Sequence, residues 1–312
     1  MKPSIAVLTR PLPLPTVPVG QGELQYRTYE GDPSVFEGAQ VLIATAVDPV
    51  RAELIAQMPD SVRLIANIGV GYDNIDLEAA KARGIAVTNT PVVTEDTADL
   101  TFALLLAACR QLSVNERFLR AGQWSTRQPM AAMGTRVHGQ TLGIIGFGEI
   151  GQAVARRARG FNMTVLYHGP RAKPEAAEAL GAEFCADLDQ LLARSDVVTL
   201  HCPLTEQTCG LLGREALAKM KAGAVLVNTG RGDLVDDGAL IEALRSGHLA
   251  AAGLDVFQGE PDFNADYLSL DNVTLTPHIG SATAACRQHM GATALANVIA
   301  FFQGQPLPSR VA

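Results

Sequence analysis

Short apolar runs alternate with amphipathic segments along the chain, and this rhythm predicts the first layer of structure. Four runs near the start have the length and the aliphatic content of buried strands, at 5–8, 41–45, 62–67 and 85–89. Helical patterns over 51–58 and 77–83 separate the later runs. Strands that alternate with helices at this spacing indicate a parallel α/β layer, complete before residue 95.

The same rhythm resumes in the middle of the chain. Seven further runs are predicted as strands, at 142–145, 163–167, 183–185, 197–202, 224–228, 250–256 and 273–276. Two long helical patterns, 95–119 and 282–302, bracket this region, so we expect the chain to cross between two domains twice.

The predicted fold class is α/β, with two Rossmann-like or flavodoxin-like domains, parallel sheets and a cleft between the domains. A discontinuous substrate domain comprises 1–96 and 285–312, and a dinucleotide-binding domain comprises 97–284.

Between the first long helical pattern and the central strands lies a loop at about 120–137. It contains the only tryptophan, Trp124, together with Met130 and Met133. A loop of this length with apolar side chains is unusual inside a compact domain. Two interpretations stay open: an arm that packs on another subunit, and a surface loop that packs locally.

The central region opens with a glycine-rich fingerprint. After the run 142–145 come Gly146, Phe147, Gly148, Glu149, Ile150 and Gly151, and a helical pattern follows at 152–159. In such a motif the first glycine allows a tight turn, the second admits a pyrophosphate, and the third lets helix and strand pack closely. The helix N-terminus then faces the anion. The sequence therefore predicts a dinucleotide site.

Composition narrows the function classes. The 312 residues carry a formal net charge of −7 and show no basic stripe, which disfavours a nucleic-acid partner. The longest apolar run, 102–109, is too short to cross a bilayer, so no membrane association is expected. The five cysteines are spread out and form no C-x-x-C pattern. They fit free thiols in a reducing, cytoplasmic compartment, and no metal site is expected.

Three predicted strands are followed by chemically useful side chains: Arg231 after 224–228, Glu260 after 250–256 and His278 after 273–276. Ligands of such sheets bind beyond the carboxyl ends of the strands, so we expect these side chains near the nicotinamide. His278 can act as general acid and base near neutral pH. Glu260 can hold its tautomer and stabilise the imidazolium, and Arg231 can bind a carboxylate and a carbonyl oxygen.

The expected substrate pocket draws mainly on the first domain. The turn Gly69-Val70-Gly71 can present backbone N–H groups to a substrate carboxylate. The other residues expected around the substrate are Val47, Ile68, Ser281 and Arg287. His201, at the end of the run 197–202, is expected to line the cofactor cleft.

These motifs together resemble the D-2-hydroxyacid dehydrogenase family over nearly the whole chain. The resemblance rests on NIGVGYDNID (67–76), VTNTP (87–91), GFGEIG (146–151), VNTGRG (227–232), GLDVF (253–257), GEP (259–261) and PHIGSAT (277–283). It implies that Arg231, Glu260 and His278 are the catalytic set.

The resemblance also implies further contacts and an assembly. The residues expected to line the nicotinamide half of the cofactor are Cys202, Pro203, Thr208, Thr229, Asp255 and Gly280, with Gly230 beside them. It implies a homodimer joined through the 120–137 arm. The sequence is most similar to glyoxylate/hydroxypyruvate reductases, which implies that small 2-keto acids are reduced to D-2-hydroxy acids.

Cofactor choice follows from the end of the run 163–167. An NAD site usually has an acidic residue there, about 20 residues past the fingerprint, to bind the ribose hydroxyls. Here the chain reads His168, Gly169, Pro170 and Arg171. We therefore predict that NADP is preferred, with Arg171 and His168 near the 2′-phosphate, and that NAD can be used. The alternative is a solvated basic loop with relaxed cofactor choice.

Three other protein types share parts of this motif pattern. An NAD-dependent dehydrogenase of the phosphoglycerate type usually carries the acid that is missing at Gly169. Formate-dehydrogenase types resemble the pattern with Gln in place of Glu260. A non-catalytic dinucleotide-sensing module shares the catalytic motifs, and only the lack of basic or disordered tails disfavours it. Turnover of 2-keto acids would distinguish enzyme from sensor.

Overall fold

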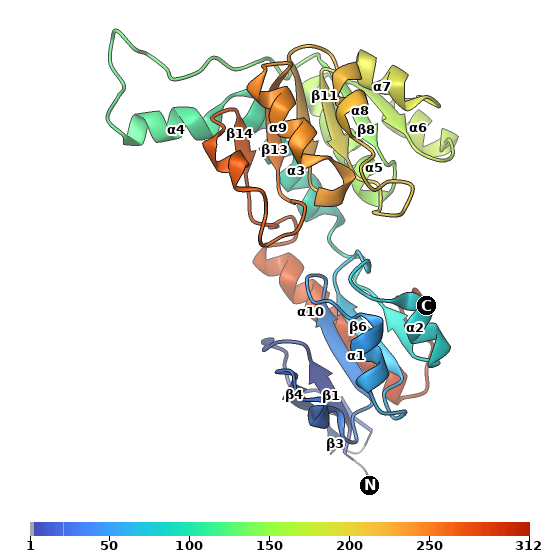
Figure 1. Cartoon of the computed structure of the whole chain (residues 1–312). Coiled ribbons are helices and arrows are strands. Elements are labelled where there is room, and N and C mark those ends of the chain that lie inside the picture. The colour runs from blue at the N-terminus through green and yellow to red at the C-terminus, as the bar shows by residue number, and fades with distance from the viewer. Residues whose placement is uncertain (1–2, 21) are drawn as a thin grey trace. The chain divides into compact units, whose positions relative to one another are not determined.

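Residues 3–20 and 22–312 are described by the structure, a computed structural model (Figure 1), and the chain divides into two units. Unit 1 runs to Val93 and resumes at Ser281, and unit 2 is Thr94–Gly280. The limits expected from the sequence lie a few residues further along the chain in both places.

Unit 1 is built on a parallel sheet of five strands in the order β4-β1-β5-β6-β7. Its strands are β1 (Ile5–Leu8), β4 (Gln25–Thr28), β5 (Val41–Thr45), β6 (Leu64–Ile68) and β7 (Ala86–Thr88). The remaining elements are α1 (Ala52–Gln57), α2 (Leu77–Ala82), a 3-10 turn at Pro33–Phe36 and the short antiparallel pair β2 (Pro18–Val19) and β3 (Gly22–Glu23). The last helix of the chain, α10 (Ala284–Phe302), packs against β6, and Val311 pairs with Val87 beyond it.

One strand of this sheet was not predicted from the sequence. β4 forms the edge next to β1, and its residues Gln25-Tyr26-Arg27-Thr28 are half-buried or exposed. An edge strand faces solvent along one side and needs no apolar run, so hydrophobic periodicity does not reveal it. The fully buried strand β1, by contrast, is a continuous apolar run, and β6 is apolar except for Asn67, as expected for a parallel sheet covered on both faces.

Unit 2 contains a parallel sheet of seven strands in the order β10-β9-β8-β11-β12-β13-β14. The strands are β8 (Thr141–Ile145), β9 (Thr164–His168), β10 (Ala182–Phe184), β11 (Val197–Leu200), β12 (Ala224–Asn228), β13 (Leu249–Leu254) and β14 (Val273–Leu275). The helices are α3 (Thr94–Cys109), α4 (Leu112–Arg120), α5 (Glu149–Ala158), α6 (Pro174–Leu180), α7 (Leu188–Arg194), α8 (Arg214–Lys219) and α9 (Asp237–Arg245), with 3-10 turns at Arg159–Phe161, Gly232–Leu234 and Ala265–Ser269. The direction of winding reverses between β8 and β11, which is where such sheets bind ligands.

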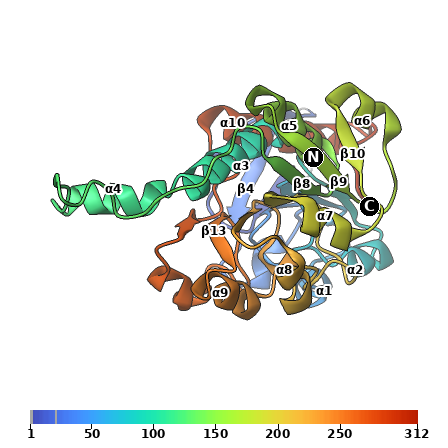
Figure 2. The same ribbon diagram turned by 90° about the horizontal axis from the view of Figure 1, so that it is seen from above.

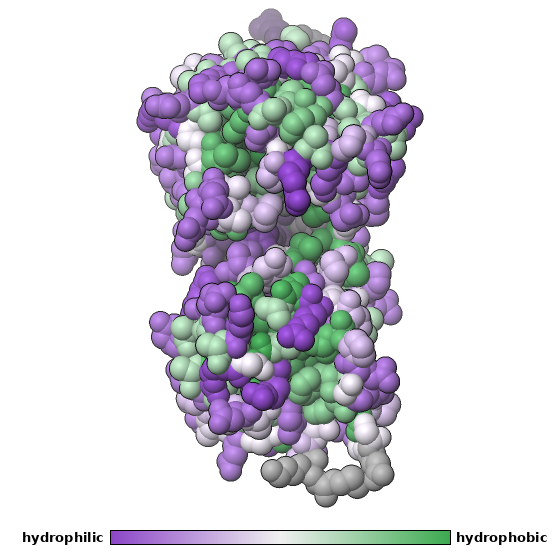
Figure 3. Space-filling model, turned by 90° about the vertical axis from the view of Figure 1, so that its right-hand side faces the viewer, coloured by the Kyte–Doolittle hydropathy of each residue, from purple (hydrophilic) through white to green (hydrophobic). Residues whose placement is uncertain are grey.

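Both faces of the unit 2 sheet are covered by helices. One core contains Leu104 of α3 and Val154 of α5, and the other contains Leu192 of α7, Leu217 of α8 and Leu240 of α9. Figure 2 shows these helices around the sheet. The face drawn in Figure 3 mixes hydrophilic and hydrophobic residues in both units without a continuous hydrophobic band.

The strands predicted from the sequence agree with the structure to within two residues at either end, and three of them, β1, β5 and β12, coincide with it. For one helix the predicted start is too late in the sequence. α5 starts at Glu149, three residues before the predicted start, because the helical pattern was counted from the first residue after the fingerprint. The third glycine therefore lies inside the helix.

The predicted single helix over 95–119 is wrong. The structure has α3 and α4, bent by 65° at a break where Gln111 adopts a left-handed conformation with φ of 52°. The returning chain causes the break: Thr135 donates its N–H to the carbonyl of Cys109 at 2.7 Å, and a Cβ on Gly134 would come within 2.5 Å of that same oxygen. Within the described residues no single helix is long and apolar enough to cross a membrane; α3 and α4 meet that criterion only when taken together.

The loop after α4 extends away from the rest of unit 2 (Figures 1 and 2). Trp124 and Met133 are 66% and 80% exposed, so they do not pack locally. Asn115 of α4 nevertheless fixes the base of the loop, since its side chain accepts from the N–H of Ala131 and donates to the carbonyl of Ala132. The loop is an ordered projection with apolar side chains at its surface.

Candidate active site

The glycine fingerprint forms the turn from β8 into α5, and its outer glycines are required by the protein's own packing. Gly146 has a φ of 95°, and a Cβ there would lie 2.3 Å from the backbone nitrogen of Cys202. A Cβ on Gly151 would lie 2.2 Å from the carbonyl oxygen of Gly146. These positions let β8, α5 and the end of β11 approach one another closely.

The middle glycine is different, and it shows that the site fits a dinucleotide. A Cβ on Gly148 would meet no atom within 4 Å, so space lies open before the N-terminus of α5, where Gly148 is the N-cap. Beside this turn, Nδ1 of His201 is buried without a hydrogen-bond partner among the described residues. Open space at unpaired helix N–H groups is what a pyrophosphate requires. Phe147, in contrast, is buried and stacks on Tyr167 with ring centroids 4.0 Å apart, so its ring belongs to the core.

His201 and Cys202 follow β11 and carry no proton or thiolate chemistry. Burial lowers the pKa of His201 to about 3, so the ring is neutral near pH 7, and its Nε2 is paired with the hydroxyl of Thr199 at 3.0 Å. Burial raises the pKa of the Cys202 thiol to about 11. Neither group supplies an acid or a nucleophile at neutral pH.

His278 and Glu260 form a direct pair. Nδ1 of His278 lies 2.5 Å from Oε1 of Glu260, and the two side chains are 32% and 28% exposed. The other carboxylate oxygen of Glu260 accepts the backbone N–H of Phe257 at 3.3 Å. Because the carboxylate accepts at Nδ1, that nitrogen carries a proton, and Nε2 is the atom left to exchange one with a ligand.

Asp255, at the end of β13, organises the segment that carries His278. Its carboxylate accepts the Thr276 hydroxyl at 2.6 Å and the backbone N–H groups of Ile279 and Gly280, both at 2.8 Å. Burial raises the pKa of the Asp255 carboxyl, although these donors oppose the rise. The segment is wound so tightly that His278 adopts a φ of 53°, a conformation rare for residues other than glycine. Asp255 and Gly280 thus position His278 through contacts within the chain.

Arg231 follows β12, the neighbour of β13 in the sheet. Asn228 fixes its loop, donating to the carbonyl of Arg231 at 2.8 Å and accepting the N–H of Gly230 at 3.0 Å. The next residue, Gly232, touches the loop after β13, since a Cβ there would lie 1.9 Å from the carbonyl carbon of Phe257. Backbone contact therefore ties the loop of Arg231 to the loop of Glu260, and the sequence analysis did not foresee this contact.

Two threonines expected at the cofactor have their hydroxyls engaged elsewhere. Thr229 is buried, and its hydroxyl pairs with that of Thr101 on α3 at 2.8 Å. The hydroxyl of Thr208 donates to the carbonyl of Pro203 at 2.7 Å and accepts the N–H of Thr205 at 2.8 Å. Both residues shape the loops at this edge of the sheet, and their hydroxyl protons are already donated within the chain.

In unit 1 the turn after β6 presents fewer donors than the sequence suggests. The N–H of Gly69 is taken by the Thr90 hydroxyl at 2.9 Å, whereas the N–H groups of Val70 and Gly71 bond to none of the described residues. Asn67 and Asn89 hold the turn from below by donating to the carbonyls of Gly71 and Val70. The sequence did not predict this loop-fixing role, although an asparagine at the end of a strand often fixes the loop that follows. Val47 is 54% exposed and Arg287 is exposed on α10.

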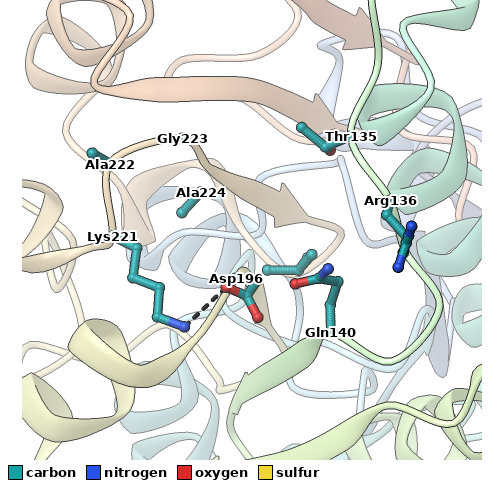
Figure 4. Close-up of a pocket in the computed structure, with 9 residues that line it drawn as sticks. Thr135, Arg136, Gln140, Asp196, Lys221, Ala222, Gly223 and Ala224 are labelled. Carbon is teal, nitrogen blue, oxygen red and sulfur yellow. Dashed lines mark hydrogen bonds and ion pairs between the residues drawn. The ribbon is translucent and has the colours of Figure 1, made fainter.

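A cavity of about 210 Å³ lies at the opposite end of the unit 2 sheet (Figure 4). Its wall includes residues that precede β8, β11 and β12, among them the ion pair of Lys221 and Asp196 at 2.9 Å. It lies at the amino ends of the strands and holds none of the residues expected in the site.

The chain is similar to known proteins in both sequence and fold. The model of the NAD-binding domain of D-isomer specific 2-hydroxyacid dehydrogenases matches residues 102–280. A glyoxylate reductase from Thermococcus litoralis is 47% identical over 275 residues, covering 86% of this chain and 82% of that protein. One from Thermococcus onnurineus is 42% identical over 100% of this chain and 96% of its own length.

Solved structures give the same picture. A glyoxylate reductase from Paecilomyes thermophila has a TM-score of 0.88 at 33% identity, covering 100% of this chain and 99% of that chain. An NADPH-dependent glyoxylate/hydroxypyruvate reductase from Sinorhizobium meliloti, solved with NADP and malonate, has a TM-score of 0.87 at 31% identity, with coverages of 100% and 97%.

Proposed function

Because the chain belongs to the D-isomer-specific 2-hydroxyacid dehydrogenases, enzymes that reduce keto acids with a nicotinamide cofactor, we propose that its substrates are glyoxylate and hydroxypyruvate and that it prefers NADPH. The observation that carries the proposal is the hydrogen bond between His278 and Glu260. These two residues and Arg231 follow β14, β13 and β12, which are consecutive neighbours in the sheet. The names of the relatives support the choice of substrates.

The nicotinamide, when bound, supplies a hydride to the carbonyl carbon of the substrate. His278 donates a proton from Nε2 to the oxygen that becomes the hydroxyl, while Glu260 stabilises the positive charge of the ring. Arg231 binds the substrate carboxylate with its planar guanidinium. Within unit 1, the N–H groups of Val70 and Gly71 are donors suited to a carboxylate. Gly148 and the first turn of α5 hold the pyrophosphate.

A change at Glu260 tests its electrostatic role. In Glu260→Gln the uncharged amide can still accept from Nδ1, but it no longer stabilises the protonated ring. Reduction needs the protonated ring, so kcat should fall by about tenfold or more. Steady-state rates at saturating cofactor check this. An unchanged kcat would remove Glu260 from the role, and a change in KM for the cofactor is not expected.

The preference for NADPH rests on the end of β9. Gly169 stands where an acidic residue would bind the ribose hydroxyls, and Arg171 is exposed two residues later. Nδ1 of His168 donates to the carbonyl of Cys185 at 2.9 Å, which fixes the ring at the end of the strand. The hydroxyl of Tyr167 accepts the N–H of Lys173 at 2.9 Å and thereby fixes this loop. These groups offer positive charge and no carboxylate to a 2′-phosphate.

The position of Gly169 allows a direct test of that preference. A Cβ there meets nothing within 4 Å, so Gly169→Asp should fold normally. The new carboxylate repels a 2′-phosphate and accepts the ribose hydroxyls, so the NADPH to NADH ratio of kcat/KM should fall by at least tenfold. Gly169→Asn, of equal size without the charge, is the matched control and should change the ratio less. A wild-type enzyme that uses both cofactors equally well would contradict the preference.

We also propose that the loop after α4 joins two copies of the chain. Its exposed Trp124, Met130 and Met133 form an apolar surface on an ordered projection, which fits a partner surface better than solvent. No disulfide joins the five cysteines, which fits a reducing compartment such as the cytoplasm.

The decisive assay follows the oxidation of NADPH and NADH with a panel of 2-keto acids. Reduction of glyoxylate and hydroxypyruvate, faster with NADPH, is the expected result. Tight cofactor binding without turnover across the panel would instead indicate a dinucleotide-sensing protein.

A further inference from the structure

An ion pair between an exposed arginine and a buried aspartate lies at the carboxyl edge of the unit 1 sheet, apart from the residues discussed so far. Arg10 follows β1, and its Nε donates to Oδ1 of Asp48 at 2.7 Å, with Nη2 on the same oxygen. The other oxygen, Oδ2, accepts the Thr9 hydroxyl at 2.5 Å and both the hydroxyl and the N–H of Thr45, at 2.7 and 3.0 Å. The Asp48 side chain is only 8% exposed.

This arrangement fixes the guanidinium of Arg10 without using all of it. Burial by itself would raise the pKa of the Asp48 carboxyl, but the hydrogen bonds from Arg10, Thr9 and Thr45 hold it below its usual value, so the anchor is charged at neutral pH. Arg10 remains 50% exposed, and its Nη1 bonds to none of residues 3–20 and 22–312. An arginine with one edge anchored and one edge open is a preorganised donor pair for an anion.

The ion pair lies beside the turn that we propose for the substrate carboxylate, because Asp48 is on the loop after β5 and the turn follows the neighbouring strand β6. β1, β5 and β6 are neighbours in the sheet, and neighbouring strands are about 5 Å apart. The pairing continues to the edge, because Thr9 donates to Ile43 and Ala46 donates to Ile68. A Cβ on Gly69 would lie 2.5 Å from that of Ala46, so the loop that bears Asp48 touches the turn that bears Val70.

We propose that Arg10 is a specificity-determining residue that binds a second carboxylate, at the far end of a 2-keto dicarboxylate substrate. This rests on the proposed function, because the first carboxylate must occupy the Val70–Gly71 donors. The chain of glyoxylate ends at its aldehyde carbon and is too short to reach from the turn after β6 to the ion pair at the end of β5. A four- or five-carbon 2-keto dicarboxylate is long enough. The substrate range therefore extends from glyoxylate to these dicarboxylates.

The test compares substrates of equal length with and without the second carboxylate: oxaloacetate against 2-oxobutyrate, and 2-oxoglutarate against 2-oxovalerate. In Arg10→Met the dicarboxylate to monocarboxylate ratio of kcat/KM should fall by about tenfold or more, as for the loss of a charge-assisted hydrogen bond. The value for glyoxylate should stay within about twofold. Arg63→Met, a matched control, removes an exposed arginine just before β6, at the other end of this sheet, and should alter neither.

A second variant separates recognition from folding. Arg10→Lys keeps a positive charge beside Asp48 but lacks the planar fork, so it should retain wild-type thermal stability and glyoxylate reduction while the ratio falls. An unchanged ratio in this variant overturns the inference, and so does a wild-type enzyme that reduces glyoxylate but neither dicarboxylate. A wild-type enzyme that reduces no 2-keto acid with either cofactor is a different result, because it overturns the proposed function itself.

Discussion

Replacing His278 by asparagine should lower kcat for 2-keto acid reduction by about 10²–10⁴-fold, the usual contribution of a positioned general acid. Asparagine is the informative replacement, because it tolerates the left-handed backbone that His278 adopts, with a φ of 53°. The segment around Asp255 should therefore keep its shape while the transferable proton is lost. Steady-state rates with saturating cofactor measure the effect.

The control for this variant is the cofactor itself. The change in the fluorescence of NADPH itself on binding should give a dissociation constant within about twofold of wild type, since His278 is proposed to act on the substrate. His138 lies before β8, at the amino ends of the strands, and is paired with Asn162, so His138→Gln should leave kcat unchanged. His201 offers no substitute acid, because burial lowers its pKa to about 3. Activity of His278→Asn within tenfold of wild type would place the proton donor elsewhere.

The parts of the fold that the sequence predicted are those where burial dictates composition. Central strands such as β5 and β12 are covered on both faces, so they are apolar up to their last residue and stand out from the flanking sequence. The fingerprint was also predictable, because any side chain at Gly146 or Gly151 would clash with a backbone atom.

The parts that were missed depend on contacts between segments distant in the sequence. The edge strand β4 is defined by pairing with β1 and not by its own polar residues. The bend between α3 and α4 has neither glycine nor proline to mark it, since Thr135 of the returning chain takes the carbonyl of Cys109. No periodicity within residues 95–119 contains that information.

The candidate site shows the same division. Which strand ends carry Arg231, Glu260 and His278 follows from the order of motifs, whereas the direction of a side chain does not. The hydroxyl of Thr229 pairs with that of Thr101, and both carboxylate oxygens of Asp255 accept hydrogen bonds from backbone N–H groups of residues 279 and 280. Hydrogen-bond choices of this kind are decided by the packed neighbours, which a single sequence does not identify.

The contact at Gly232 leads to the second large effect. In Gly232→Ala the new methyl group would lie 1.9 Å from the carbonyl carbon of Phe257, so one of the two loops must move. Because these loops carry Arg231 and Glu260, a shift of about 1 Å should lower kcat/KM by about 100-fold. Overpacking of this kind should also cost about 1–3 kcal/mol of unfolding free energy. Gly238→Ala, in the first turn of α9 with no contact closer than 3.4 Å, is the matched control and should be neutral. Kinetics and chemical denaturation of both variants check the argument, and a fully active Gly232→Ala enzyme would show that the spacing of these loops does not govern catalysis.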